Sequence, residues 1–253
     1  MARQRSGSVV VGYADGSSES ALAWAADEAA STGLRLTLLH ALAGEARHRS
    51  SHGDRVPGPS IDHVELRAEQ NAVSEVADVA ERVRGAYPQL DVTTTFVHEH
   101  AGRSLVEVSH EAALLVVGAG PAGQTSSGGV LEHVLARAEC TLVVVPAAEV
   151  PGTDDPTSGS PPQDGLVVVG VEDVEQSQDA IGYGSARADR RGGSVTVIDL
   201  TASSLDDLCR AGRAADVVVI EAFGRRRSAR HHLRATVDAL VQRAGRPVVV
   251  VRG

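Results

Sequence analysis

The chain contains a series of short apolar runs, and a second series repeats the first in the same order. Val9–Val11 at the start of the first series recurs as Leu166–Val171. Thr141–Val145 at its end recurs as Pro247–Val251. Self-similarity of this kind indicates that a whole small domain has been duplicated within one chain. Two intermediate runs show the same relationship: those at Gly33 and Ala113 recur at Gly193 and Ala215.

The runs are rich in valine and lack polar alternation, which is typical of strands buried on both faces of a parallel sheet. In the first series, amphipathic helical stretches lie between the runs, so the order reads β-α-β-α-β-α-β-α-β. This alternation predicts an α/β fold with two doubly wound, Rossmann-like parallel sheets in tandem. We expect the first helix to begin after an N-cap at Ser18 or Ser20, and further helices over residues 64–86, 105–112 and 130–137. The second strand is expected over Leu34–Leu39.

Residues 148–165 are rich in Pro, Gly, Ser and Asp, a composition typical of a linker. We therefore expect one domain over residues 1–147 and a second over residues 166–253. The second domain is smaller, because far fewer residues separate its second run from the run at Val217 than in the first domain. We expect it to lack one helix and one strand.

Composition limits the class of protein. Of 253 residues 42% are hydrophobic but only 2% are aromatic, so the core must be aliphatic. The net charge of −9 disfavours nucleic-acid binding, and no apolar run approaches the ~18 residues of a membrane span. Two cysteines, Cys140 and Cys209, give neither a disulfide framework nor a metal-binding motif. The histidines within residues 44–63, together with His98 and His100, lack the close spacing of a metal site. A soluble cytoplasmic protein without a metal site is expected.

A glycine-rich loop lies between the run Leu114–Val117 and the helix expected over 130–137. Glycines between a strand and a helix let backbone N–H groups approach an anion, and the helix N-terminus adds partial positive charge. A flexible turn has the same composition, so this loop alone leaves both interpretations open. Its glycines include Gly118, Gly120, Gly123, Gly128 and Gly129.

Five ordered segments resemble the universal stress protein family in its tandem two-domain form. The resemblance spans both repeats and implies an adenine nucleotide alpha hydrolase-like fold, with a stress-response or regulatory role in the bacterial cytoplasm. The segments are Val9–Ser17, Ala23–Ala29, Leu36–Ala41, Val116–Gly118 and Cys140–Val145.

The resemblance implies that the first domain binds ATP. Asp15 would contact the adenosine, Ala41 would line the adenine pocket, and the glycine loop would cradle the phosphates. The loop departs from the family pattern, because only four residues separate Gly123 from Gly128 and Gly129 replaces a hydroxyl residue. Two functions therefore stay open: a regulator that binds adenine nucleotide, or a scaffold of the same fold without nucleotide. No catalytic motif is present, so we expect no enzyme beyond slow ATP hydrolysis.

The second domain carries arginines where the first carries glycines. Glu172 stands at the expected position of the aspartate, and the stretch after Glu221 holds Arg225, Arg226, Arg227 and Arg230. These arginines are either a solvated face or a weak anion site, since guanidinium groups bind phosphate without help from glycine.

The last strand of each domain is almost wholly apolar. Exposed sheet edges of this kind promote aggregation, and paired domains in the family commonly associate through them. We expect Thr141–Val145 and Pro247–Val251 to pair antiparallel, forming an intrachain pseudo-dimer centred near Val144 and Val249. Further association into a homodimer is compatible with this arrangement but not required.

Overall fold

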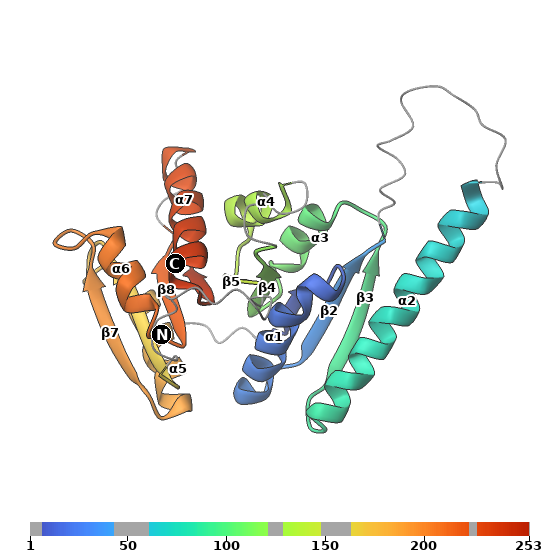
Figure 1. The fold of residues 1–253 in the computed structure, drawn as a ribbon, viewed down its shortest axis with the longest axis horizontal. Coiled ribbons are helices and arrows are strands. Elements are labelled where there is room, and N and C mark those ends of the chain that lie inside the picture. The colour runs from blue at the N-terminus through green and yellow to red at the C-terminus, as the bar shows by residue number, and fades with distance from the viewer. Residues whose placement is uncertain (1–6, 43–60, 121–128, 148–162, 223–226, 253) are drawn as a thin grey trace, which may run out of the picture.

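A computed structural model describes residues 7–42, 61–120, 129–147, 163–222 and 227–252 (Figure 1). They form one nine-stranded sheet with the order β3-β2-β1-β4-β5-β9-β8-β6-β7. Neighbouring strands are parallel except at the centre, and helices cover both faces. The predicted α/β class is confirmed. The predicted linker, residues 148–165, lies largely outside the described residues.

The first half of the sheet contains all the strands and helices that the sequence predicted for it. Its strands are β1 (Val9–Gly12), β2 (Leu36–Ala41), β3 (Val92–Val97), β4 (Leu114–Gly118) and β5 (Thr141–Val145). Its helices are α1 (Glu19–Thr32), α2 (Ile61–Ala86), α3 (Ala101–Val108) and α4 (Val130–Arg137), with a 3-10 turn over Gly16–Ser18 before α1.

The second half is shorter, and its described residues lack counterparts of α2 and β3. As a result, β7 is an edge strand, and Val197 within it is 42% exposed. The strands are β6 (Leu166–Val171), β7 (Ser194–Asp199), β8 (Val217–Glu221) and β9 (Val248–Val251). The helices are α5 (Gln178–Arg191), α6 (Leu205–Gly212) and α7 (Arg227–Ala244).

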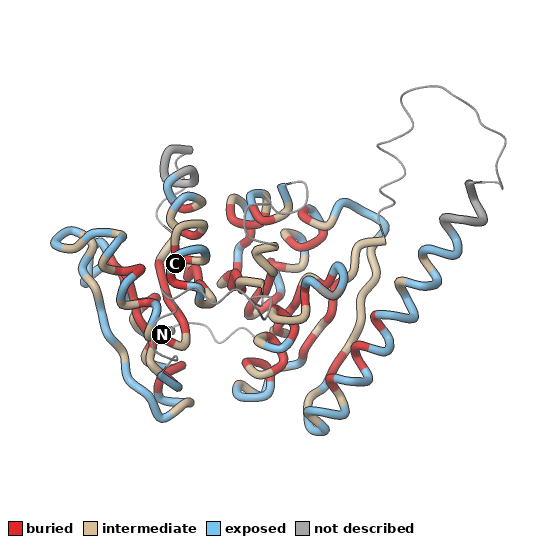
Figure 2. The backbone as a smooth tube through the Cα atoms, viewed as in Figure 1, coloured by how far each residue is buried: buried red, intermediate tan, exposed pale blue. Residues whose placement is uncertain are grey.

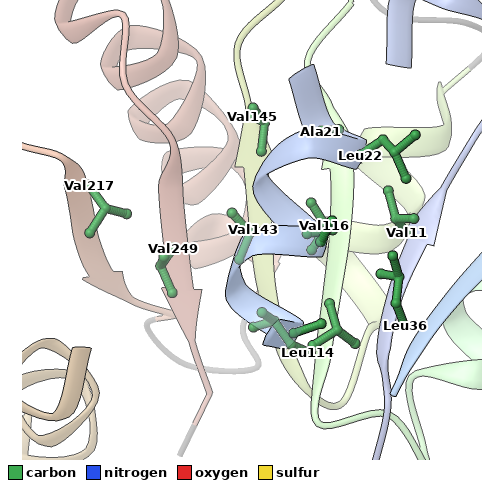
Figure 3. Close-up of a cluster of buried hydrophobic side chains, with 14 of the residues drawn as sticks. Val11, Ala21, Leu22, Leu36, Leu114, Val116, Val143, Val145, Val217 and Val249 are labelled. Atoms are coloured by element: carbon green, nitrogen blue, oxygen red, sulfur yellow. The ribbon is translucent and has the colours of Figure 1, made fainter. Parts of the chain in front are cut away.

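The two halves meet where β5 and β9 pair antiparallel. Val143 lies opposite Val249, and Val144 lies opposite Val248, so the pairing is offset by one residue from the centre expected at Val144 and Val249. All four side chains are fully buried, and Figure 3 shows Val143 beside Val249. Each apolar edge thereby becomes the interior of one continuous sheet.

Successive side chains of each strand point to opposite faces, so the valine runs supply two cores at once. Val143 packs on the face covered by α1, α2 and α5, whereas Val144 packs on the face covered by α3, α4, α6 and α7. Figure 2 shows this buried interior between exposed outer helix surfaces. The core is mainly aliphatic on both faces, as the composition required, and the buried Tyr13 ring lies on the face covered by α1.

Three local predictions were wrong. The helix expected over 105–112 runs instead over Ala101–Val108, and Ser109 ends it by donating its hydroxyl to the Val106 carbonyl at 2.6 Å. The second strand begins at Leu36 rather than Leu34, because the Leu34 N–H still bonds to the end of α1. The Ser18 side chain does not cap α1; its Oγ accepts from the Ala14 N–H at 3.1 Å.

Candidate functional site

The strand order of the first half reverses between β1 and β4. The crossover from β1 passes through α1 on one face of the sheet, and the crossover from β4 passes through α4 on the other. Such a switch point leaves a crevice at the carboxyl ends of the strands, where ligands of this fold class bind. The turns that leave the two strands are neighbours, since a Cβ added to Gly118 would lie 3.9 Å from the Ser17 carbonyl oxygen.

Asp15 lies in the first of these turns. Its Oδ1 accepts hydrogen bonds from the Ser17 N–H at 2.8 Å and the Ser17 hydroxyl at 2.5 Å. These bonds, more than the nearby His40, lower the pKa of the Asp15 carboxyl, which is therefore ionised at neutral pH. In the part of the chain that the structure describes, Oδ2 has no hydrogen-bond partner, so one carboxylate oxygen is free to accept from a ligand.

The second half repeats this turn at Asp173. Asp173 follows Gly170 by three residues, as Asp15 follows Gly12. The two glycines are equivalent, because each follows the three valines that pair with the neighbouring parallel strand, β2 for Gly12 and β7 for Gly170. The Asp173 Oδ1 accepts from the N–H groups of Glu175 and Gln176 at 2.9 and 3.2 Å. The counterpart of Asp15 is thus Asp173 and not Glu172, which corrects the sequence interpretation. Counting from the shared glycine would have revealed it.

The ends of β1 and β2 are tied together beside this turn. His40 on β2 donates from Nδ1 to the Tyr13 carbonyl at 2.9 Å, because a carbonyl can only accept. The Tyr13 ring is buried, which raises the pKa of its hydroxyl to about 12, and the hydroxyl lies 3.4 Å from Glu19 Oε1. Ala41 follows His40 at the carboxyl end of β2, half-buried. The fold thus brings Asp15, Ala41 and Gly118 to the same edge of three adjacent strands.

The described ends of the glycine loop have backbones suited to glycine. Gly120 and Gly129 have φ angles of 75° and 77°, in the left-handed region that other residues rarely adopt. Gly123 and Gly128 lie outside the described residues, as do Arg225 and Arg226 of the second half. Arg227 and Arg230 fall within α7, but their side chains are outside the description. The anion site predicted for these arginines therefore stays a prediction.

A shallow hollow of about 440 Å³ opens elsewhere, between α1 and α2. Glu19, Glu75 and Arg82 line it, and the Arg82 guanidinium pairs with Glu19 at 2.7 Å. It shares Tyr13 and Glu19 with the region described above and contains none of the predicted nucleotide residues. We therefore place the candidate site at the switch point rather than in this hollow.

Two other kinds of site find no support in the described ranges. No three His, Cys, Asp or Glu side chains gather there as a metal would require. No helix there is long and apolar enough to cross a membrane.

Comparison with known proteins agrees with this architecture. A family model described as "Universal stress protein family" matches residues 6–146. Universal stress protein Rv2005c of Mycobacterium tuberculosis and Universal stress protein Mb2028c of Mycobacterium bovis are each 28% identical over 190 residues. These alignments cover 73% of this chain but only 60% of each relative's length.

Solved structures of low sequence identity match nearly the whole chain. A universal stress protein from Archaeoglobus fulgidus DSM 4304 has a TM-score of 0.64 at 13% identity, covering 98% of this chain and 97% of its own. The functionally unknown protein PA1789 from Pseudomonas aeruginosa PAO1 has a TM-score of 0.58 at 14% identity, covering 98% and 94%. At such identities the likeness establishes the fold and leaves the ligand open.

Proposed function

This chain belongs to the universal stress protein family, and from that premise we propose that it binds an adenine nucleotide, ATP, at the carboxyl edge of β1, β2 and β4. Its role would be that of a cytoplasmic stress-response regulator whose signal is the occupancy of this site. The observation that carries the proposal is the contact between the Asp15–Ser17 turn and Gly118 at the switch point.

The described residues fit such a ligand. The ionised Asp15 offers a free oxygen to the hydroxyl groups of a ribose, and the small Ala41 side chain leaves space at the end of β2. Gly118 has no side chain to block its N–H, and Gly120 and Gly129 adopt backbones that let a loop turn tightly around an anion. When bound, ATP would supply the triphosphate that this loop recognises.

Titration calorimetry with ATP and AMP tests the proposal. Asp15→Asn removes the charge but keeps an acceptor for Ser17, and Gly118→Val blocks approach to the backbone. Each change should weaken ATP binding at least about tenfold, the loss of one hydrogen bond to a charged group. Asp173→Asn is the matched control, because it makes the same change in the second half and should leave affinity unaltered.

Two results would contradict the proposal. Tight ATP binding that survives both first-half substitutions would place the nucleotide elsewhere. Failure of the wild-type chain to bind either nucleotide would favour the alternative, a scaffold of the same fold without nucleotide.

A further inference from the structure

Four basic or protonatable side chains gather where α3 and α4 lie side by side (Figure 1): His100, Arg103, His133 and Arg137, here called the α3–α4 basic cluster. His100 is the N-cap of α3, and Arg103 lies in its first turn. Between them, Gly102 packs against α4 so closely that a Cβ on it would lie 3.3 Å from the His133 Cβ. Residues distant in sequence therefore share one surface.

The cluster lacks acidic partners among the described residues. The Arg137 guanidinium is hydrogen-bonded to His133 Nδ1 at 2.8 Å. The exposed Arg103 side chain makes no hydrogen bond or ion pair with any residue that the structure describes. Arg35 and Arg84 differ from these two arginines, since each pairs with a carboxylate at 2.6 Å. In a chain of net charge −9, this is a local concentration of unneutralised positive charge.

The hydrogen bond between Arg137 and His133 fixes the state of the imidazole. A guanidinium can only donate, so His133 Nδ1 must accept, and the neutral ring then carries its proton on Nε2. Burial lowers the pKa of His133, and the positive charges of Arg137, His100 and Arg103 lower it further. His133 thus keeps a free N–H donor in a positive field.

The start of α3 adds backbone donors. The His100 side chain makes no cap, and the first N–H bonded within the helix is that of Arg103, which reaches the His100 carbonyl at 2.9 Å. The N–H groups of Ala101 and Gly102 precede it and have no acceptor within the helix. Such groups, with the helix dipole behind them, attract anions.

We propose that the α3–α4 basic cluster binds a chain of phosphates. Two guanidinium groups can hold adjacent phosphates through paired N–H donors, and His133 adds a third donor without a further full charge. His100 and Arg103 lie at the carboxyl edge of the sheet, where α3 begins after β3, and the cluster extends along α4 through His133 to Arg137 in the last turn of that helix. The phosphates are either free polyphosphate or the tail of a nucleotide, and only the second source rests on the proposed function.

Calorimetry at low ionic strength with inorganic tripolyphosphate, ATP and AMP tests the inference. The double variant Arg103→Gln/Arg137→Gln should weaken tripolyphosphate binding by at least about tenfold, because it removes two charged donors. The matched control Arg35→Gln/Arg84→Gln removes the same charge at the amino edge of the sheet and should have little effect. Circular dichroism confirms that both variants fold.

The two sources give different results. Competition between ATP and tripolyphosphate would identify a nucleotide tail, whereas independent binding would identify free polyphosphate; both support the site. Asp15→Asn should spare tripolyphosphate binding, which separates this site from adenosine recognition. The inference is overturned if the wild-type chain does not bind tripolyphosphate, or if the cluster variant binds it as tightly as the control variant.

Discussion

Glu28 of α1 and Arg187 of α5 form a buried ion pair between the two halves of the chain, with side chains only 3% and 2% exposed. Arg190 also donates to Glu28, at 2.8 Å, and Arg187 donates to Asp216 at 3.0 Å. The Arg187 guanidinium lies 4.8 Å from the centre of the Trp24 ring. Burial lowers the pKa of Arg187, and Asp216 opposes that shift. Charges in such a place are tolerable only while each keeps its partner.

Removing one partner should therefore destabilise the protein strongly. Glu28→Gln is expected to lower the free energy of unfolding by up to about 3–5 kcal/mol, since it leaves the buried Arg187 with only the partly exposed Asp216 as a counter-charge. The double variant Glu28→Leu/Arg187→Met should lose much less. Urea unfolding followed by circular dichroism measures both. The control Asp206→Asn breaks the exposed pair with Arg243 and should change stability by less than about 1 kcal/mol. A comparably small effect of Glu28→Gln would contradict the argument.

Asp15 should make stability depend on pH in the acid range. Its folded pKa is lowered from 3.8 by the bonds from Ser17, so its contribution is present above the unfolded pKa and lost as pH falls through the folded pKa. The stability difference between the wild type and Asp15→Ala should be constant above about pH 5 and shrink below it. Denaturant unfolding from neutral pH to about pH 2 checks this. A difference that does not vary with pH would show that the charge of Asp15 contributes nothing.

Arg137 should hold down the pKa of His133. Burial is the larger cause of the lowered value, but Arg137 is the first of its charged neighbours, so Arg137→Gln should raise the His133 pKa. Titration of the His133 ring by nuclear magnetic resonance measures the shift directly. Arg35→Gln provides the control and should leave His133 unchanged. An unaltered or lower pKa in Arg137→Gln would mean that the two groups do not interact in solution.

Val143 and Val249 should be energetically coupled across the join. Each is fully buried, so each truncation to alanine should destabilise by about 1–3 kcal/mol. Because they lie opposite each other, the double variant should differ from the sum of the two single effects. The control pair is Val143→Ala with Val168→Ala, because Val168 lies on β6, which is not adjacent to β5. Their effects on the free energy of unfolding, measured in urea, should be additive. Strict additivity of the first pair would argue against β5–β9 pairing in solution.

Most of the fold could be predicted because its strands are buried on both faces. Runs such as Leu114–Val117 and Val217–Ile220 contain hardly any polar residue, and the tandem repeat adds a second reading of the same pattern. The α3 helix was misplaced because its first turn contains Gly102 and Arg103, which show no apolar stripe. Tertiary packing against His133 fixes that turn, and no local pattern reports it.

The candidate site was predictable only in part. Parallel strands bring their carboxyl ends to one edge, so Asp15, Ala41 and Gly118 could be placed together from topology. Asp173 was missed because Glu172, an acidic residue, stands immediately before it. The α3–α4 basic cluster and the Glu28–Arg187 pair were missed because their members are distant in sequence and meet only when the helices pack.

The charges on α1 and α5 also determine which halves can associate. Asp27 and Glu28 on α1 face Arg191, Arg187 and Arg190 on α5, the equivalent helix of the other half. Two first halves joined symmetrically through their β5 edges would set acid against acid, and two second halves would set arginine against arginine. Each half is therefore electrostatically matched to the other half and mismatched to a copy of itself. The presence of both halves in one chain permits this asymmetry, because a substitution then appears on one side of the join, whereas in a homodimer it would appear on both.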